Sequence, residues 1–269
     1  MENENILILK KNELMKLSDA DYFARPELNF STFKNFLVSG KYFEAKKDEE
    51  EKESDSLLFG SIFHASVLDR EELSKYKTFP VLDKRTKAGK EQWEVLTKEA
   101  EEKKLTLVSE EIFNDATNVN LTPVVQGILE NEGNIFENSI LWDYQSLHLK
   151  SKIDIYNPNT KTLVDVKTTR DLPGFERVIN SSRYYMQMAF YQMALEACGY
   201  EVNSWKIIAV ENTAPFDNTV FTFTKDYIDY SMAYLKVKLD AFIFESEIAG
   251  FKGLSEEKEI EVELPKYFY

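Results

Sequence analysis

The chain has 269 residues, of which 43% are hydrophobic and 13% aromatic, enough for a sizeable packed core. Its one cysteine, Cys198, excludes a disulfide framework and a zinc site built from cysteines. A net charge of −14, from 33 basic and 47 acidic residues, opposes long-range attraction to nucleic acids. Much of the acidic excess lies in two runs, at 48–55 and from 255 onward, which we expect to be solvated segments.

The first residues lack the ordered basic and apolar regions of a signal peptide. No apolar run approaches the roughly 18 residues that a membrane-spanning helix needs. We therefore expect a protein of the cytoplasm.

The first half of the chain has the apolar spacing of helices. One helix is expected from Ser31, as its N-cap, to a stop at Gly40, and a second over residues 56–69 with His64 on an otherwise apolar face. A basic loop at 83–90 leads into a charged helix ending near residue 103. A further helix is expected from about residue 109 to 132.

The pattern changes to β-branched and aromatic residues at residue 134. We predict strands over about 135–143, 146–156 and 161–168, with a turn at the sequence NPNT. A helix over 183–198, strands over 204–212 and 216–224, and a helix over 226–249 follow. This order predicts an α/β (α+β) fold with a central mixed β-sheet flanked by helices. We expect one domain over 1–269, with a helical part at 1–133, a sheet core at 134–249 and an acidic tail at 250–269.

The chemistry is expected on the second and third of these strands. Asp165 and Lys167 are two residues apart, so both side chains leave one face of the sheet, while Val166 joins Val164 in the core on the other. The NPNT turn brings Asp154 beside Asp165. Carboxylates hold Mg²⁺, which activates water and polarises a phosphate, and a lysine can orient the attacking water. The pattern therefore favours phosphodiester hydrolysis.

Glu137 and His64 are further candidates for this site. Strict alternation places Glu137 on a face with Ile135 and Ser139, opposite Phe136, Ile140 and Trp142, from where it could reach the same ion. His64 could bind a metal or contact a phosphate. Taken singly, an acid–x–lysine pattern is more often a surface ion pair, and a histidine on an apolar helix is more often a core residue.

The ordered motifs resemble those of a known nuclease superfamily. The sequence IDIYNPNTKTLVDVKTT is similar to the D…(D/E)-x-K signature of the PD-(D/E)XK nucleases, with Asp165 in the (D/E) position. Gln187 and Tyr191, one helical turn apart, resemble the Q-x-x-x-Y motif of the branch that contains lambda-type and RecE exonucleases and RecB-like domains. The segments GSIFHASVLD, KRTKAGKEQW and FENSILW resemble further blocks of the RecE (exonuclease VIII) family. The resemblance covers residues 28–194 and implies a restriction-endonuclease-like core.

The resemblance also implies an activity and roles for the residues. The family is expected to be a Mg²⁺-dependent, processive 5′→3′ exonuclease on double-stranded DNA ends, for which Mn²⁺ can substitute. It would act in phage or prophage recombination in a bacterial host cell, as a ring-shaped homo-oligomer with a RecT-type annealing partner. Metal ligands would be Asp154, Asp165, the Val166 carbonyl, Glu137 and His64. Lys167 would position the nucleophile, and Gln187 and Tyr191 would support or contact the substrate strand. The chain would be the nuclease domain alone.

The basic loop is the candidate DNA-contacting patch, although an exposed solubilising loop is an equal alternative. Its residues are Lys84, Arg85, Lys87 and Lys90. Two other functions stay open: a structure-specific or restriction-type endonuclease on the same fold, and a non-catalytic DNA-binding module. The polarity of digestion rests on resemblance alone.

Overall fold

The computed structural model describes residues 11–49, 54–80, 82–83, 85–255 and 259. The first half of the chain contains helices of four to 17 residues and two short strands. They are α1 (Asp19–Phe23), α2 (Phe30–Phe33), α3 (Gly40–Lys46), α4 (Asp55–Leu68), the 3₁₀-helix η1 (Arg70–Lys75), β1 (Tyr76–Phe79), α5 (Lys87–Lys103), β2 (Thr106–Ser109), α6 (Glu110–Thr117) and α7 (Pro123–Leu129).

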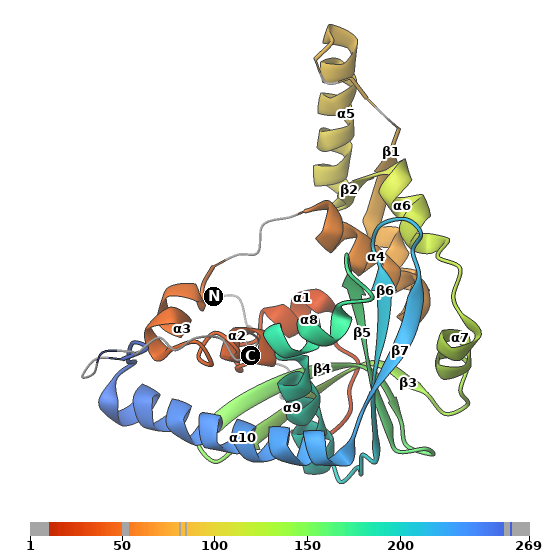
Figure 1. Cartoon of the computed structure of the whole chain (residues 1–269). Helices are drawn as coiled ribbons and strands as arrows, with labels where there is room; N and C mark the ends of the chain where they lie inside the picture. The colour runs from red at the N-terminus through yellow and green to blue at the C-terminus, as the bar shows by residue number, and fades with distance from the viewer. Residues whose placement is uncertain (1–10, 50–53, 81, 84, 256–258, 260–269) are drawn as a thin grey trace.

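The second half forms a five-stranded sheet with its covering helices (Figure 1). Its elements are β3 (Ile135–Tyr144), β4 (Leu147–Asn157), β5 (Thr162–Thr169), α8 (Phe175–Ser181), α9 (Tyr184–Ala197), β6 (Ser204–Glu211), β7 (Asn218–Phe223), α10 (Lys225–Phe244) and the π-helical turn η2 (Glu245–Ala249). The strand order is β3-β4-β5-β6-β7. Only the β5–β6 pair is parallel, and α8 and α9 connect its strands. The expected mixed sheet flanked by helices is confirmed.

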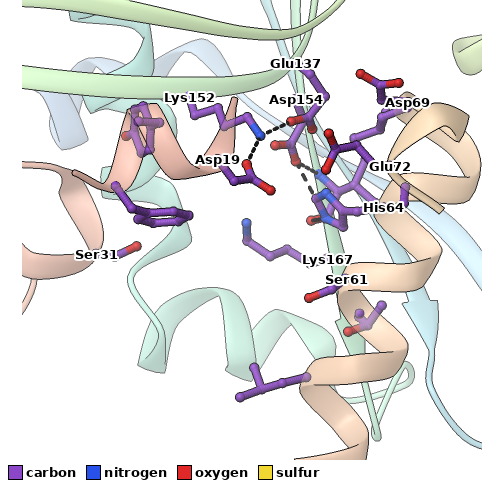
Figure 2. Close-up of a pocket in the computed structure, with 18 of the residues that line it drawn as sticks. Asp19, Ser31, Ser61, His64, Asp69, Glu72, Glu137, Lys152, Asp154 and Lys167 are labelled. Carbon is purple, nitrogen blue, oxygen red and sulfur yellow. Dashed lines mark hydrogen bonds and ion pairs between the residues drawn. The ribbon is translucent and has the colours of Figure 1, made fainter. Parts of the chain in front are cut away.

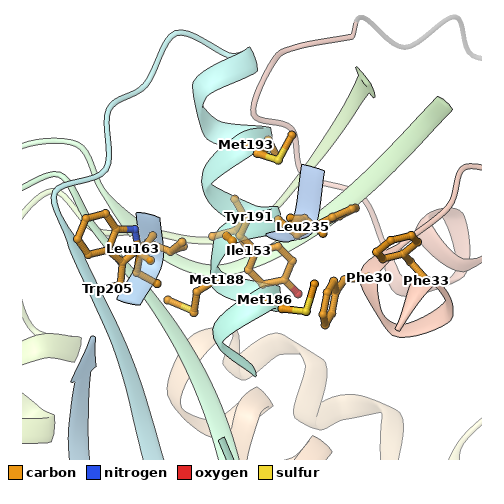
Figure 3. Packing of buried hydrophobic residues seen from close by; sticks show 14 of the residues in the cluster. Phe30, Phe33, Ile153, Leu163, Met186, Met188, Tyr191, Met193, Trp205 and Leu235 are labelled. Atoms are coloured by element: carbon orange, nitrogen blue, oxygen red, sulfur yellow. The ribbon is translucent and has the colours of Figure 1, made fainter. Parts of the chain in front are cut away.

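Helices cover both faces of this sheet. On one face α9, α10 and the N-terminal helices α2 and α3 enclose a large core that includes Phe190, Trp142 and Leu163 (Figure 3). On the other face α4 packs Ile62 and Phe63 against Val164 and Val166 of β5. Val164 and Val166 therefore share one face of β5, as the sequence pattern predicted, while Leu163 lies in the core on the other face.

The N-terminal helices differ from the expectation. Asn29 caps α2, and its side chain accepts the Thr32 N–H at 2.8 Å, whereas Ser31 lies inside the helix. Gly40 does not end a helix: it begins α3, which Ser39 caps. The single helix expected over 109–132 is two helices, because the chain leaves the helical conformation after α6 and restarts at Pro123, a residue suited to a first helical turn.

The charged helix α5 projects away from the sheet on a two-stranded parallel sheet of β1 and β2 (Figure 1). This small sheet was not expected, since its strands have only four residues each. Lys87 and Lys90 belong to α5 itself, capped by Thr86, and are not part of a loop. Lys84 lies outside the described residues. In the part of the chain that the structure describes, no helix is both long and apolar enough to cross a membrane.

Candidate metal and catalytic site

The site begins where β4 and β5 separate. Three residue pairs join these strands beside the turn, and the last of them is Ile155 with Val164. At the next residue of β4 away from the turn, the side chain of Asp154 replaces the backbone pairing: its Oδ2 accepts the Val166 backbone N–H at 2.7 Å. A buried carboxylate thus replaces the strand partner that Val166 loses. Asp154 lies within β4, three residues before its end.

A backbone distortion places Glu137 opposite Asp154. The β3–β4 register pairs Phe136 with Ile155 and Asn138 with Ile153, and Glu137 between them has a φ of +50°. A positive φ is strained for a residue other than glycine, and such strain is common at functional sites.

This distortion breaks the strict alternation expected for β3. Phe136 packs against the core under α4, whereas Ile140 and Trp142 belong to the core under α9. The expectation that all three share one face was therefore wrong: β3 changes the core that it faces at Glu137, as β4 does between Ile153 and Ile155.

Helix α4 brings His64 to the same place. Ser54 caps the helix, and Gly60 allows it to approach β5, since an added Cβ would lie 3.1 Å from Thr168 Oγ1. One turn later His64 Nε2 donates to the Val166 carbonyl at 2.8 Å and lies 3.9 Å from Asp154 Oδ2. With its proton on Nδ1 instead, the ring would offer the Nε2 lone pair to a cation.

His64, Glu137 and Asp154 form a group that could hold a metal ion. Each offers one ligand atom, and these atoms all lie within 4.8 Å of one another. Opposite ligands of an octahedral Mg²⁺ are about 4.2 Å apart, twice a bond of about 2.1 Å. At most one pair of three ligands can be opposite, and adjacent ligands lie about 3.0 Å apart, so the three side chains would move closer together around a divalent cation. Asp165 is not a member of this group.

Asp165 and Lys167 form a buried ion pair beside the group. Lys167 Nζ lies 2.6 Å from Asp165 Oδ2, and Asp165 is 1% exposed. That contact lacks hydrogen-bond geometry, so neither carboxylate oxygen has a hydrogen-bond partner among the described residues. A buried carboxylate with unused acceptors fits a place next to a cation.

Electrostatic interactions within the site favour the charged form of Lys167 and disfavour ionisation of Asp154. Burial alone would lower the pKa of Lys167, but the charges of Asp165 and Asp154 outweigh it, and the pKa is raised. The pKa of Asp154 is raised by burial and then by the charge of Asp165. A bound cation would relieve this repulsion between carboxylates.

Helix α9 supplies the two residues of the expected Q-x-x-x-Y motif. Gln187 Nε2 donates to the Tyr191 hydroxyl oxygen at 2.8 Å, which leaves the hydroxyl proton free to donate. Burial and the nearby charges of Asp165 and Asp154 raise the pKa of Tyr191 well above its ordinary value, so the hydroxyl stays neutral. Tyr184, two turns before Tyr191, has Lys167 Nζ 5.1 Å from the centre of its ring.

These groups line one cavity of about 660 Å³ (Figure 2). Its wall includes His64, Glu137, Asp154, Val166, Lys167, Tyr184 and Tyr191, together with Asp19 and Lys152. Arg85, Lys87 and Lys90 do not line it, and Arg85 and Lys87 are almost fully exposed on and beside α5.

Two residues of this wall, Lys152 and Asp19, were not predicted from the sequence. Lys152 could have been found, because it stands two residues before Asp154 on the same predicted strand. For Asp19 the sequence offered no comparable indication, since it lies in a five-residue helix far from the motifs.

Solved structures resemble this chain at low sequence identity. A crystal structure described as a “putative exonuclease” from Eubacterium rectale is 15% identical, with a TM-score of 0.59, and the match covers 92% of this chain and 97% of that one. A phage-related exonuclease from Haemophilus somnus 129PT is 11% identical over 84% of this chain and 99% of that one, and its TM-score of 0.31 carries no argument. The first likeness shows the fold. The comparison with curated proteins gave no match.

A family model covers most of the chain. The model described as a PDDEXK-like domain of unknown function (DUF3799) matches residues 29–244. This range contains His64, Glu137, Asp154, Asp165 and Lys167. The chain therefore belongs to this family of PDDEXK-like domains.

Proposed function

We propose that this protein is a Mg²⁺-dependent deoxyribonuclease that hydrolyses phosphodiester bonds at the ends of double-stranded DNA. The observation that carries the proposal is the position of His64, Glu137 and Asp154, whose ligand atoms lie within 4.8 Å of one another beside a charged lysine. Mn²⁺ would substitute for Mg²⁺, because carboxylate ligands suit both ions.

The roles of the residues follow from their contacts. Asp154, Glu137, His64 and the Val166 carbonyl would hold the cation, and the carboxylate of Asp165, which is paired with Lys167 but has no hydrogen-bond donor among the described residues, would complete its surroundings. The cation would supply Lewis-acid activation of water and of the phosphate.

The protein's own donors would act around the reacting phosphate. Lys167 is charged and has donors beyond its contact with Asp165, so it would orient the attacking water and offset negative charge that develops on the phosphate. It would not remove a proton. The neutral Tyr191 hydroxyl, held by Gln187, would donate to the substrate strand.

The finer assignment is a processive 5′→3′ exonuclease of phage or prophage recombination, acting as a homo-oligomeric ring with a single-strand annealing partner of the RecT type. It is supported by the order of the sequence motifs, by membership of the PDDEXK-like family and by the fold shared with the Eubacterium rectale protein. The long exposed helix α5, with basic residues at its start, offers a surface for duplex DNA beyond the cavity.

The test uses a linear duplex labelled at either 5′ or 3′ end and a covalently closed circle, with and without Mg²⁺. The proposal expects metal-dependent loss of the linear substrate, early release of the 5′ label, and an intact circle. Cleavage of the circle would show that the protein is an endonuclease, because a closed circle has no ends for an exonuclease. No cleavage of either substrate with Mg²⁺ or Mn²⁺ would contradict the nuclease proposal.

A further inference from the structure

A lysine outside the recognised motifs stands between two carboxylates in the wall of the cavity. Lys152 Nζ lies 2.6 Å from Glu137 Oε2 and 2.6 Å from Asp19 Oδ1, and Figure 2 shows both contacts. Glu137 comes from β3, Lys152 from β4 and Asp19 from α1. The ammonium therefore joins the sheet to a helix that begins more than one hundred residues earlier in the chain.

Asp19 is held from two sides. Its Oδ1 contacts Lys152, and its Oδ2 lies 3.6 Å from Lys75 at the end of η1. Lys75 in turn pairs with Glu72. The charged side chains thus alternate in sign along one row of contacts, from Glu137 through Lys152, Asp19 and Lys75 to Glu72.

Glu137 needs such a counter-ion when no metal is bound. Its ligand atom lies within 4.8 Å of that of Asp154. Two carboxylates this close repel each other. A glutamate has three side-chain torsions with which to turn away into the cavity. Lys152 occupies one oxygen of Glu137, and the other lone pairs stay available for a cation.

We propose that Lys152, anchored by Asp19, is a positioning residue that keeps the Glu137 carboxylate directed at His64 and Asp154 before a metal ion binds. The inference rests on the proposed function, because it presupposes a metal site at these three residues. Partners that orient a metal ligand contribute about 10–100-fold to metal affinity in other proteins. An ammonium group that did not orient a ligand would instead lower the metal affinity, since it repels a cation.

The opposite signs of these two effects make the inference testable by metal binding alone. Mn²⁺ is titrated calorimetrically into the full chain and into four variants: Lys152→Met, Lys152→Arg, Asp19→Asn and Lys161→Met. Lys152→Met keeps most of the apolar stem and removes the charge. Lys161→Met is the matched control, because Lys161 pairs with Glu201 outside the cavity. Thermal melting without metal runs in parallel.

We expect Lys152→Met to weaken Mn²⁺ binding about 10–100-fold, Lys152→Arg to restore part of it, Asp19→Asn to weaken it less, and the control to bind like the wild type. Unchanged or tighter binding by Lys152→Met overturns the inference, even if its melting temperature falls. Should Lys152→Met not fold, wild-type affinity in Asp19→Asn overturns it equally. A wild-type chain that binds no Mn²⁺ contradicts the metal site itself, which is a separate and recognisable result.

Discussion

The cavity between β4, β5 and α4 and the exposed start of α5 both carry charge, but in opposite physical settings. Beside the cavity Asp165 is 1% exposed, and Lys167 in the cavity wall is 20% exposed. On α5 the side chains of Arg85 and Lys87 are 93% and 92% exposed. Buried charges interact strongly because water does not screen them, whereas exposed charges contribute little individually and respond to salt. The cavity should therefore control turnover, and α5 should affect only the capture of substrate.

The largest effect is expected from Asp165→Asn. The substitution keeps the shape of the side chain and removes the charge that would face a cation. Turnover should fall by about 10³-fold or more, since a catalytic metal contributes several kcal/mol to the barrier. Rates of duplex degradation with saturating Mg²⁺ measure this, and circular dichroism checks the fold. Normal turnover would remove Asp165 from the site.

A smaller but still large loss is expected from Lys167→Ala. Loss of one preorganised donor to a developing charge typically costs about 10²–10³-fold in rate. The variant also leaves Asp165 without its counter-ion, so melting temperatures should be compared in the presence of Mg²⁺. The double variant with Asp165→Asn separates the two effects. If the single variant degrades duplex DNA at the wild-type rate, the catalytic role of this lysine is wrong.

Asp154→Asn should change the pH dependence of stability without metal. The folded protein raises the pKa of Asp154 above its unfolded value near 3.8, so ionisation is costlier in the folded state. The wild type should therefore lose stability as pH rises from about 4 towards neutral, by at most about 1.4 kcal/mol per pH unit from this group. The variant should lack this contribution. Denaturant unfolding at several pH values in the presence of a chelator measures this contribution. If the free energy of unfolding changes equally with pH in the wild type and the variant, the raised pKa of Asp154 is contradicted.

The smallest effect is expected from a triple variant, Arg85→Ala, Lys87→Ala and Lys90→Ala. If these side chains contact phosphates, the slope of log affinity against log salt should fall by about 0.9 for each lost contact, while turnover at saturating substrate stays unchanged. Binding to a duplex in Ca²⁺, measured by fluorescence anisotropy at several salt concentrations, shows the slope. An unchanged slope would leave these residues as an exposed basic surface without a role in DNA capture.

The contrast between the two regions also explains what the sequence could predict. The strands β4 and β5 were predicted within about one residue from their β-branched and aromatic residues and the turn between them, and the residues of β5 alternate regularly between the two sides of the sheet. Val166 in the core and Lys167 beside Asp165 followed from that alternation alone. The ordered motifs then indicated His64, whose helix packs on the same strand.

The rest depended on tertiary contacts that leave no local pattern. The strand β3 changes the core that it faces at Glu137, whose φ is positive, and no neighbouring residue predicts this change. The short helix α1 is fixed to β4 by Lys150, whose Nζ donates to the Tyr22 and Arg25 carbonyls, and by Lys152. Such a helix is too short to form by itself, so its place near the cavity could not be read from propensity.

The most direct test of the metal site is a crystal of the chain grown or soaked with Mn²⁺ and measured for anomalous scattering. A strong anomalous peak should lie among His64, Glu137 and Asp154, within bonding distance of at least two of their side chains. A well-ordered cavity without such a peak, or a peak bound by other residues, would contradict the account.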